Sequence, residues 1–184
     1  MRVIAGSAKG HRLKTPTVGT RPMTDRMKEA LFSTLGDVEG IKVLDLYAGS
    51  GALGLEALSR GGSHSTFVES ARDAIVKLEQ NVETTGFADT SEIIWAEVRS
   101  TLSRPATHRV DLIFLDPPYS AAFSDVRRDL EAIVMGGFLA DDGRIVVHRP
   151  MKEKRLDVFG LDLMWERDYG QAHVYIFCHE DEEG

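Results

Sequence analysis

The chain has two different patterns of apolar and polar positions, and they divide it near residue 40. From position 41 onward, short apolar runs alternate with segments in which apolar residues recur every three or four positions. This alternation is typical of a parallel sheet with helices on its faces. It predicts strands at residues 42–46, 65–69, 92–95, 110–116 and 144–148. It predicts helices at residues 52–59, 72–85 and 124–135, with a shorter one near 99–102.

The last two apolar runs, at residues 161–169 and 173–178, are separated by a short turn that contains Gly170. A connection this short forces the two strands to run antiparallel. Five parallel strands followed by an antiparallel hairpin predict a seven-stranded, Rossmann-like α/β sheet.

The first 40 residues follow another pattern. Residues 2–5 and 12–14 are short strand candidates around a glycine-containing turn, so we expect a small β-hairpin. Thr24 is a good N-cap for a helix that continues to residue 35 and ends at Gly36. We therefore divide the chain into an N-terminal hairpin and helix, residues 1–40, and a main domain, residues 41–184, which ends in an acidic tail.

Composition excludes several classes of protein. No apolar run approaches the roughly 20 residues needed to cross a bilayer, and Gly6 comes too early for the hydrophobic stretch of a signal peptide. Cys178 is the single cysteine, so it cannot form an internal disulfide, and the six histidines show no metal-ligand spacing. We expect a cytoplasmic, metal-free protein that works as a monomer.

Charge is distributed unevenly along the chain. The net charge is −7, yet residues 1–30 carry seven basic and only two acidic residues. A positive arm on an acidic body can place phosphate contacts on one face and limit non-specific binding. Charge alone favours the simpler interpretation of a solvated surface hairpin.

A glycine-rich segment follows the first strand of the main domain. Gly49, Gly51 and Gly54 have the spacing G-x-G-x-x-G between a strand and a helix, and Glu69 ends the next strand 18 residues after Gly51. Glycines let the backbone approach a ligand closely, and a carboxylate at the next strand end can accept hydrogen bonds from ribose hydroxyls. This context favours a nucleotide-like ligand over an empty tight turn. It does not separate a nicotinamide cofactor from S-adenosylmethionine, although Asp45 would suit a cationic ligand.

The apolar run at residues 110–115 ends in Asp116, Pro117, Pro118 and Tyr119. An exocyclic amine of a base is a poor nucleophile, because its lone pair is delocalised into the ring. The Asp116 carboxylate and a backbone carbonyl of the proline pair could accept its two hydrogens and free that lone pair. Proline fixes φ and removes a competing N–H, so the turn is stiff. Tyr119 offers a face for base stacking, worth about 1–3 kcal/mol.

Asp45, Glu69 and Asp116 all lie at carboxyl ends of predicted parallel strands. Ligands of open α/β sheets bind beyond these ends, so we expect the three carboxylates to surround one crevice. A rigid surface turn remains the alternative for the tetrapeptide by itself. Combined with the glycine loop, the tetrapeptide favours methyl transfer to an amine of a base.

The sequence resembles the RsmD-type guanine-N2 methyltransferases of bacterial small-subunit ribosomal RNA. The similarity spans nearly the whole chain and is most specific at residues 21–32, 44–61 and 116–119. The resemblance implies a class I, seven-stranded methyltransferase fold, S-adenosylmethionine as methyl donor, and a guanine of small-subunit rRNA, within an assembled or assembling subunit, as target.

The resemblance also implies roles for individual residues. The catalytic residues would be Asp116, Pro117, Pro118 and Tyr119. The cofactor-binding residues would be Asp45, Tyr47, Ala48, Gly49, Ser50, Gly51, Glu69, Ser70, Glu97 and Val98. The RNA-binding residues would be Arg2, Lys9, Arg12, Lys14, Arg21, Thr24 and Arg26. No metal site is implied.

Three positions depart from the family pattern. Met23 stands where a second threonine is usual, and Ala71 replaces a commonly acidic residue. His148 stands where an acidic residue is frequent, and we interpret it as an ordinary strand-end histidine rather than a pocket residue.

Other functions share parts of these signals. The tetrapeptide does not distinguish guanine-N2 from adenine-N6, so an adenine methyltransferase acting on DNA or RNA is an alternative. A protein glutamine amide presents a similar planar nitrogen, but the N-terminal segment argues against it. A non-catalytic RNA-binding assembly protein is the alternative outside enzymes, and the intact Asp116 and Gly49–Gly51 loop argue against it.

Overall fold

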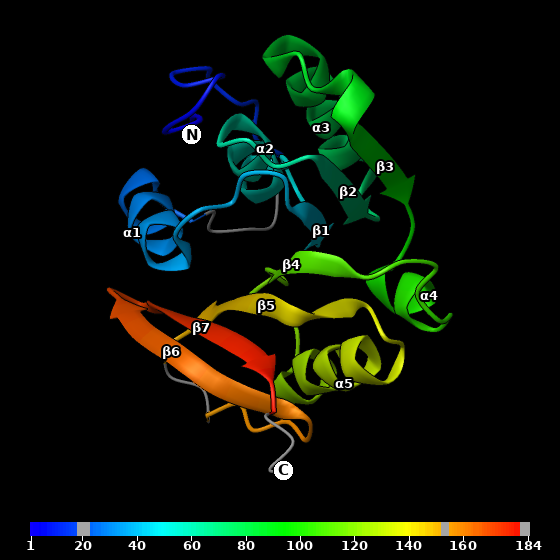
Figure 1. Cartoon of the computed structure of the whole chain (residues 1–184). Coiled ribbons are helices and arrows are strands. Elements are labelled where there is room, and N and C mark those ends of the chain that lie inside the picture. The colour runs from blue at the N-terminus through cyan, green and yellow to red at the C-terminus, as the bar shows by residue number, and fades with distance from the viewer. Residues whose placement is uncertain (18–22, 152–154, 181–184) are drawn as a thin grey trace.

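The computed structural model describes residues 1–17, 23–151 and 155–180, and a seven-stranded sheet runs through the middle of these residues (Figure 1). The strand order is β3-β2-β1-β4-β5-β7-β6. The first five strands pair in parallel, whereas β7 is antiparallel to both β5 and β6, as predicted. The strands are β1 (Lys42–Leu46), β2 (His64–Glu69), β3 (Ser91–Trp95), β4 (Val110–Leu115), β5 (Leu139–Pro150), β6 (Leu161–Tyr169) and β7 (Ala172–His179).

Helices cover both faces of the sheet. On one face lie α1 (Asp25–Leu35), α2 (Ala52–Ser59) and α3 (Arg72–Thr85), and on the other lie α4 (Val98–Leu102) and α5 (Phe123–Met135) (Figure 1). A short 3-10 helix, η1 (Ala88–Thr90), precedes β3. The central strands are buried on both faces, which explains why their sequences are continuous apolar runs rather than alternating ones.

The chain reverses its direction across the sheet at β1. From β1 it proceeds outward through β2 to β3, then returns to β4 on the other side of β1. The connections after β1 and β4 therefore leave on opposite faces, and a crevice opens between their carboxyl ends. The predicted glycine loop and the predicted tetrapeptide follow these two strands.

Two elements differ from the sequence-based expectations. The N-terminal hairpin is reduced to one antiparallel bridge, between Arg2 and Arg12, with backbone hydrogen bonds on either side of it. β5 begins at Leu139 rather than at residue 144. The segment before residue 144 contains Asp141, Asp142 and Gly143, which read as a loop, but it is accommodated as an irregularity in the pairing with β4.

The N-terminal arm, which is the described part of the chain before α1, and α1 itself pack on the same sheet that the rest of the chain forms. α1 shares a buried apolar cluster with β1, β4, β5 and β7, and the arm shares another with α2 and α3. The division of the chain at residue 40 stays a prediction. In the described ranges, no helix has the length and apolar character needed to span a membrane.

Candidate active site

A cavity of about 500 Å³ lies at the carboxyl ends of β1, β2 and β4. It brings together Asp45, Glu69 and Asp116, the three strand-end carboxylates that the sequence predicted to meet. Eight of the ten predicted cofactor-binding residues line it: Asp45, Tyr47, Ala48, Gly49, Ser50, Glu69, Ser70 and Glu97. The other two, Gly51 and Val98, are buried beside it, and Val98 is part of the core under α5.

The glycine loop turns sharply from β1 into α2. Gly49 and Gly51 have φ values of +57° and +78°, in the left-handed region that favours glycine. A Cβ on Gly51 would lie 2.4 Å from the side chain of Leu78, so this position also needs glycine for space. The loop can therefore present its backbone to a ligand in the cavity.

Tyr47 also has a positive φ, of +59°, and is the non-glycine exception among the described residues. Its hydroxyl donates a 2.7 Å hydrogen bond to Asp129 of α5, whose side chain is buried. Burial, followed by this contact with Asp129, raises the pKa of Tyr47, so the phenol keeps its proton and remains a donor. The strained loop residue is thereby attached to a helix on the far face of the sheet.

Glu69 holds the backbone of two loops that line the cavity, the one after β1 and the one after β2. One carboxylate oxygen accepts from the Gly49 N–H at 2.8 Å, and the other accepts from the N–H groups of Ser70 and Ala71. A carboxylate oxygen can accept two hydrogen bonds, so the Gly49-bound oxygen keeps one position for a ribose hydroxyl.

Asp45 is buried, and its carboxylate accepts a 3.0 Å hydrogen bond from the Gly54 N–H. Burial raises the pKa of Asp45 well above its ordinary value, and the nearby Asp116 and Glu69 raise it further. A cation in the cavity would relieve this crowding of acidic groups. The three carboxylates and the glycine loop therefore fit S-adenosylmethionine, which carries a sulfonium and an ammonium group.

Asp116 also lines the cavity, and it follows β4 immediately. Its side chain is 24% exposed. The buried side chain of Arg149 donates hydrogen bonds to the carbonyl oxygens of Pro118, at 3.2 Å, and Ala121, at 2.8 Å. These two hydrogen bonds could not be predicted from the sequence, because β5 and the tetrapeptide are about 30 positions apart.

His148 lies near the end of β5, and it makes contacts that the sequence alone did not indicate. It is 2% exposed, and its Nδ1 lies 2.8 Å from Asp116 Oδ1. Its Nε2 lies 3.2 Å from the hydroxyl of Tyr119. His148 therefore touches two of the four predicted catalytic residues.

Comparison with known proteins decides the family. The family model described as "Conserved hypothetical protein 95" matches residues 1–178. Ribosomal RNA small subunit methyltransferase D (RsmD) of Escherichia coli (strain K12) is 35% identical over 149 residues, which cover 80% of this chain and 73% of that protein. The chain belongs to the RsmD family.

Two further relatives match over nearly their whole lengths. YlbH of Bacillus subtilis (strain 168) is 35% identical over 182 residues, covering 96% of this chain and 98% of that protein. The solved structure of yhhF from Escherichia coli has a TM-score of 0.87 at 31% identity, covering 99% of each chain. The class I methyltransferase fold that the sequence predicted for this RsmD-family chain is therefore confirmed.

In this RsmD-family chain the N-terminal arm forms one wall of the cavity. Met1, Thr15, Pro16 and Met23 all line it. The buried amide of Asn81, on α3, accepts from the Lys14 N–H and donates to the carbonyls of Lys14 and Ser50. Asn81, which the sequence analysis did not single out, thus connects the arm directly to the glycine loop.

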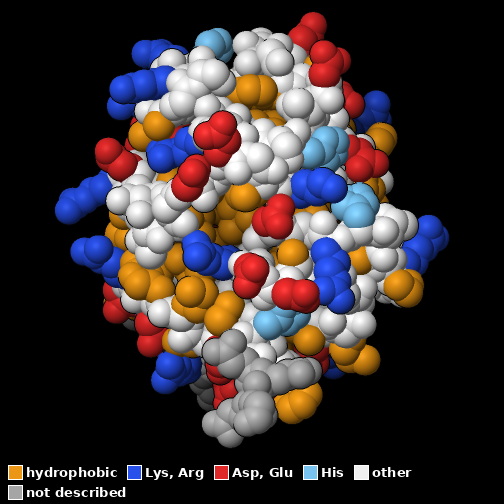
Figure 2. Space-filling view, viewed as in Figure 1, with side chains coloured by type: hydrophobic (Ala, Val, Ile, Leu, Met, Phe, Trp, Pro, Cys, Tyr) orange, Lys and Arg blue, Asp and Glu red, His pale blue; other side chains and the backbone are white. Residues whose placement is uncertain are grey.

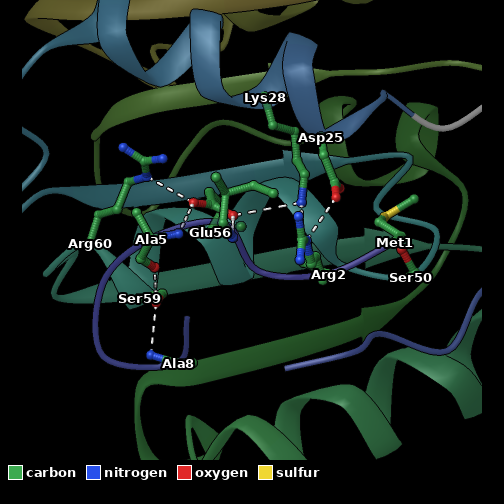
Figure 3. A network of polar contacts seen from close by, with 12 residues as sticks. Met1, Arg2, Ala5, Ala8, Asp25, Lys28, Ser50, Glu56, Ser59 and Arg60 are labelled. Carbon is green, nitrogen blue, oxygen red and sulfur yellow. Dashed lines mark hydrogen bonds and ion pairs between the residues drawn. The ribbon is translucent and has the colours of Figure 1, made fainter. Parts of the chain in front are cut away.

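A buried ion pair fastens the arm and α1 to α2 (Figure 3). Lys28 of α1 and Glu56 of α2 are both fully buried, with Nζ and Oε2 3.6 Å apart. Figure 3 shows Glu56 between Lys28, Arg60 and the arm, where it also accepts from the N–H groups of Ile4 and Ala5. Burial lowers the pKa of Lys28, while Glu56 opposes the shift by favouring its charged form. Lys28 therefore helps to hold the N-terminal arm of this RsmD-family chain in place, and it is not a surface charge.

The predicted RNA-binding residues fall into two groups. Lys9, Arg12 and Arg26 are exposed, and their side chains make no hydrogen bond or ion pair to another described residue. The other described ones have local partners: Arg2 pairs with Asp25 at 3.0 Å, Lys14 Nζ donates to Gln80, and Thr24 caps α1. Arg21 lies outside the described residues. In Figure 2, Lys and Arg side chains appear at the upper left, over the N-terminal arm, and along the left edge.

Proposed function

We propose that this protein transfers a methyl group from S-adenosylmethionine to the exocyclic N2 amine of a guanine in small-subunit ribosomal RNA. The observation that carries the proposal is that the glycine loop and Asp116 line the same cavity. A donor held at the loop and an amine held at Asp116 would therefore face one another. The substrate class comes from the relatives, of which the one in Escherichia coli is named for methylation of the small ribosomal subunit.

The cofactor's chemistry is simple: when bound, it supplies an electrophilic methyl group on a positively charged sulfur. In the proposal, Asp45 and Glu69 bind its polar groups, and the backbone of Gly49 and Ser50 forms the wall against which it lies. Glu97, which follows β3 and lines the cavity, would contact the adenine of the cofactor, and Ser70, which follows β2, lines the cavity as well.

The protein's own residues prepare the amine for attack. Asp116 accepts one N2 hydrogen, and a carbonyl of the proline pair accepts the other, which frees the nitrogen lone pair. Pro118 O already accepts from Arg149 and from the Ala121 N–H. We therefore assign the second acceptor to Pro117 O, because no hydrogen bond from another described residue reaches it.

Alignment supplies the rest of the rate enhancement. A stiff turn that holds nitrogen, methyl and sulfur in line can contribute several kcal/mol. Tyr119 provides the stacking face for the guanine. No strong base is required, since the nitrogen becomes acidic once methylated and can release its proton to the Asp116 carboxylate.

The direct test uses small subunits from cells that lack this protein. The purified protein and a labelled donor are incubated with these subunits, with free rRNA and with DNA, and the labelled nucleoside is then identified. We expect N2-methylguanosine from the subunits. N6-methyladenine would support the adenine alternative, and no transfer by a protein that still binds the donor would support a non-catalytic RNA-binding role.

A further inference from the structure

The carboxyl end of β5 holds the catalytic tetrapeptide from both faces of the sheet. Consecutive strand residues point to opposite faces. His148 lies beside Val174 on the α1 face, and Arg149 lies on the face of α5. Arg149 binds backbone carbonyls of the tetrapeptide and the turn after it, whereas His148 binds the side chains of Asp116 and Tyr119.

The partners of His148 determine which atom donates in each of its two hydrogen bonds. An ionised Asp116 offers only acceptors, so the Nδ1 of His148 must carry the hydrogen in the 2.8 Å contact. In a neutral imidazole Nε2 is then an acceptor, and the Tyr119 hydroxyl donates to it at 3.2 Å. With a neutral imidazole, the donors therefore run in one direction, from Tyr119 to His148 to Asp116.

This arrangement sets which oxygen of Asp116 can meet a substrate. Oδ1 is taken by His148, and no hydrogen bond from the described residues reaches Oδ2. The ring of Tyr119 is held by the same imidazole, in an edge contact with ring centroids 5.6 Å apart. One buried side chain thus orients the group that would accept the amine hydrogen and the ring that would carry the base.

We propose that His148 is a positioning residue for the methyl transfer, which sets the plane of the Asp116 carboxylate through Nδ1 and the ring of Tyr119 through Nε2. This inference rests on the proposed function, and it assigns the two effects to two separate atoms. The competing explanation is a histidine that only fills space in the core. That explanation requires no ordered pair of hydrogen bonds to two neighbouring catalytic side chains.

Three substitutions distinguish the role of Nδ1 from the role of Nε2. The amide nitrogen of Asn lies as many bonds from Cα as Nδ1, so His148→Asn keeps a donor for Asp116 and loses the Tyr119 contact. The amide of Gln lies as many bonds from Cα as Nε2, so His148→Gln keeps a partner for Tyr119 and loses the donor to Asp116. His148→Leu removes both contacts and keeps an apolar side chain.

We expect the kinetic constants to divide accordingly. His148→Asn should keep kcat within about threefold and raise KM for the RNA, because the stacking ring is less restrained. His148→Gln should lower kcat at least about tenfold with a smaller change in KM, the effect expected for loss of a hydrogen bond to a charged group. His148→Leu should show both effects, and all three variants should bind the cofactor as the wild type does.

Two results would overturn the inference. Wild-type kcat and KM in His148→Leu would show that the imidazole positions nothing. Equal losses in all three variants, together with weaker cofactor binding, would show a role in folding alone.

A second measurement is independent of the substrate. The ring-nitrogen NMR signals of His148 in the wild-type protein should show hydrogen on Nδ1, and Asp116→Asn should perturb them. The opposite tautomer would contradict the inference even if the protein methylates guanine. The expected tautomer in a protein that methylates no nucleic acid would leave the geometry standing and reject the proposed function instead.

Discussion

At the scale of single residues, Asp45 shows how the cavity can select a cationic ligand. The residue is 1% exposed, and this burial raises the pKa of its carboxyl group, as do the nearby Asp116 and Glu69. In the free protein the group holds a proton over a range of pH in which an exposed aspartate would be ionised. A sulfonium ligand favours the ionised form, so cofactor binding and loss of this proton are coupled.

The substitution Asp45→Asn tests this coupling through stability. Between the ordinary pKa of 3.8 and the raised folded value, the folded state binds more protons than the unfolded chain, so the free energy of unfolding decreases as pH rises. Asn keeps the acceptor for the Gly54 N–H without a charge. The free variant should therefore melt higher than the wild type at neutral pH, by about 2–4 °C for each kcal/mol regained. The difference should disappear below the ordinary pKa.

The same variant should lose affinity for the cation. We expect binding of S-adenosylmethionine to weaken at least about tenfold, equivalent to about 1.4 kcal/mol. Binding of the demethylated product, whose sulfur is neutral, should change less. Titration calorimetry with both ligands measures the two effects, and equal losses for both would contradict an electrostatic role for Asp45.

At the scale of elements, the arm depends on a close approach between Gly6 and α2. Gly6 has a φ of +81°, and a Cβ there would lie 1.6 Å from the carbonyl oxygen of Ser59. That oxygen accepts from the Ser7 N–H at 2.7 Å. Gly10, on the same turn, has a similar φ of +89° but open space around its Cα.

The two glycines give a matched pair of variants. Gly10→Ala should cost only the left-handed backbone strain, about 1–2 kcal/mol. Gly6→Ala should cost about 1–3 kcal/mol more, because backbone must move away from α2. Gly6→Ala should also weaken cofactor binding, since the arm supplies part of the cavity wall. Urea unfolding and calorimetry check both, and equal stability of the two variants would show that the arm is not held at Gly6.

The elements of the sheet could be predicted because their sequences carry the information locally. The apolar runs that became β1 and β4 are buried on both faces, and each ends in a motif whose position at a carboxyl end follows from the topology. The N-terminal hairpin was less predictable, because its order depends on Glu56 and Ser59 of α2 rather than on its own pairing. The start of β5 was missed because Asp-Asp-Gly reads as a turn.

The sequence predicted which strand ends form the candidate site, but it did not predict the hydrogen bonds that connect the residues there. The roles of His148, Arg149 and Asn81 are defined by partners between about 28 and 67 positions away. A single sequence does not record such pairings. The basic character of Lys28 was visible, yet its burial against Glu56 was not, since only the packing of α1 on α2 reveals it.

At the scale of the whole molecule, an acidic protein with net charge −7 carries a basic arm beside its cavity. Lys9→Gln combined with Arg12→Gln should weaken binding of the rRNA and reduce the magnitude of its salt dependence. For two lost phosphate contacts the slope of log K against log salt should fall by about 1.4–1.8. The matched control is Lys42→Gln with Arg109→Gln, which removes the same charge at the amino ends of β1 and β4. An equal change in the control would contradict a specific role for the arm.

The proposed methyl transfer depends on Asp116 acting on the amine in the cavity that holds the methyl donor. The most direct measurement compares Asp116→Ala with the wild type in cofactor binding and in single-turnover methyl transfer to small subunits. We predict a cofactor Kd within about threefold of the wild type and a transfer rate lower by at least about a hundredfold. Wild-type transfer by the variant would contradict the account.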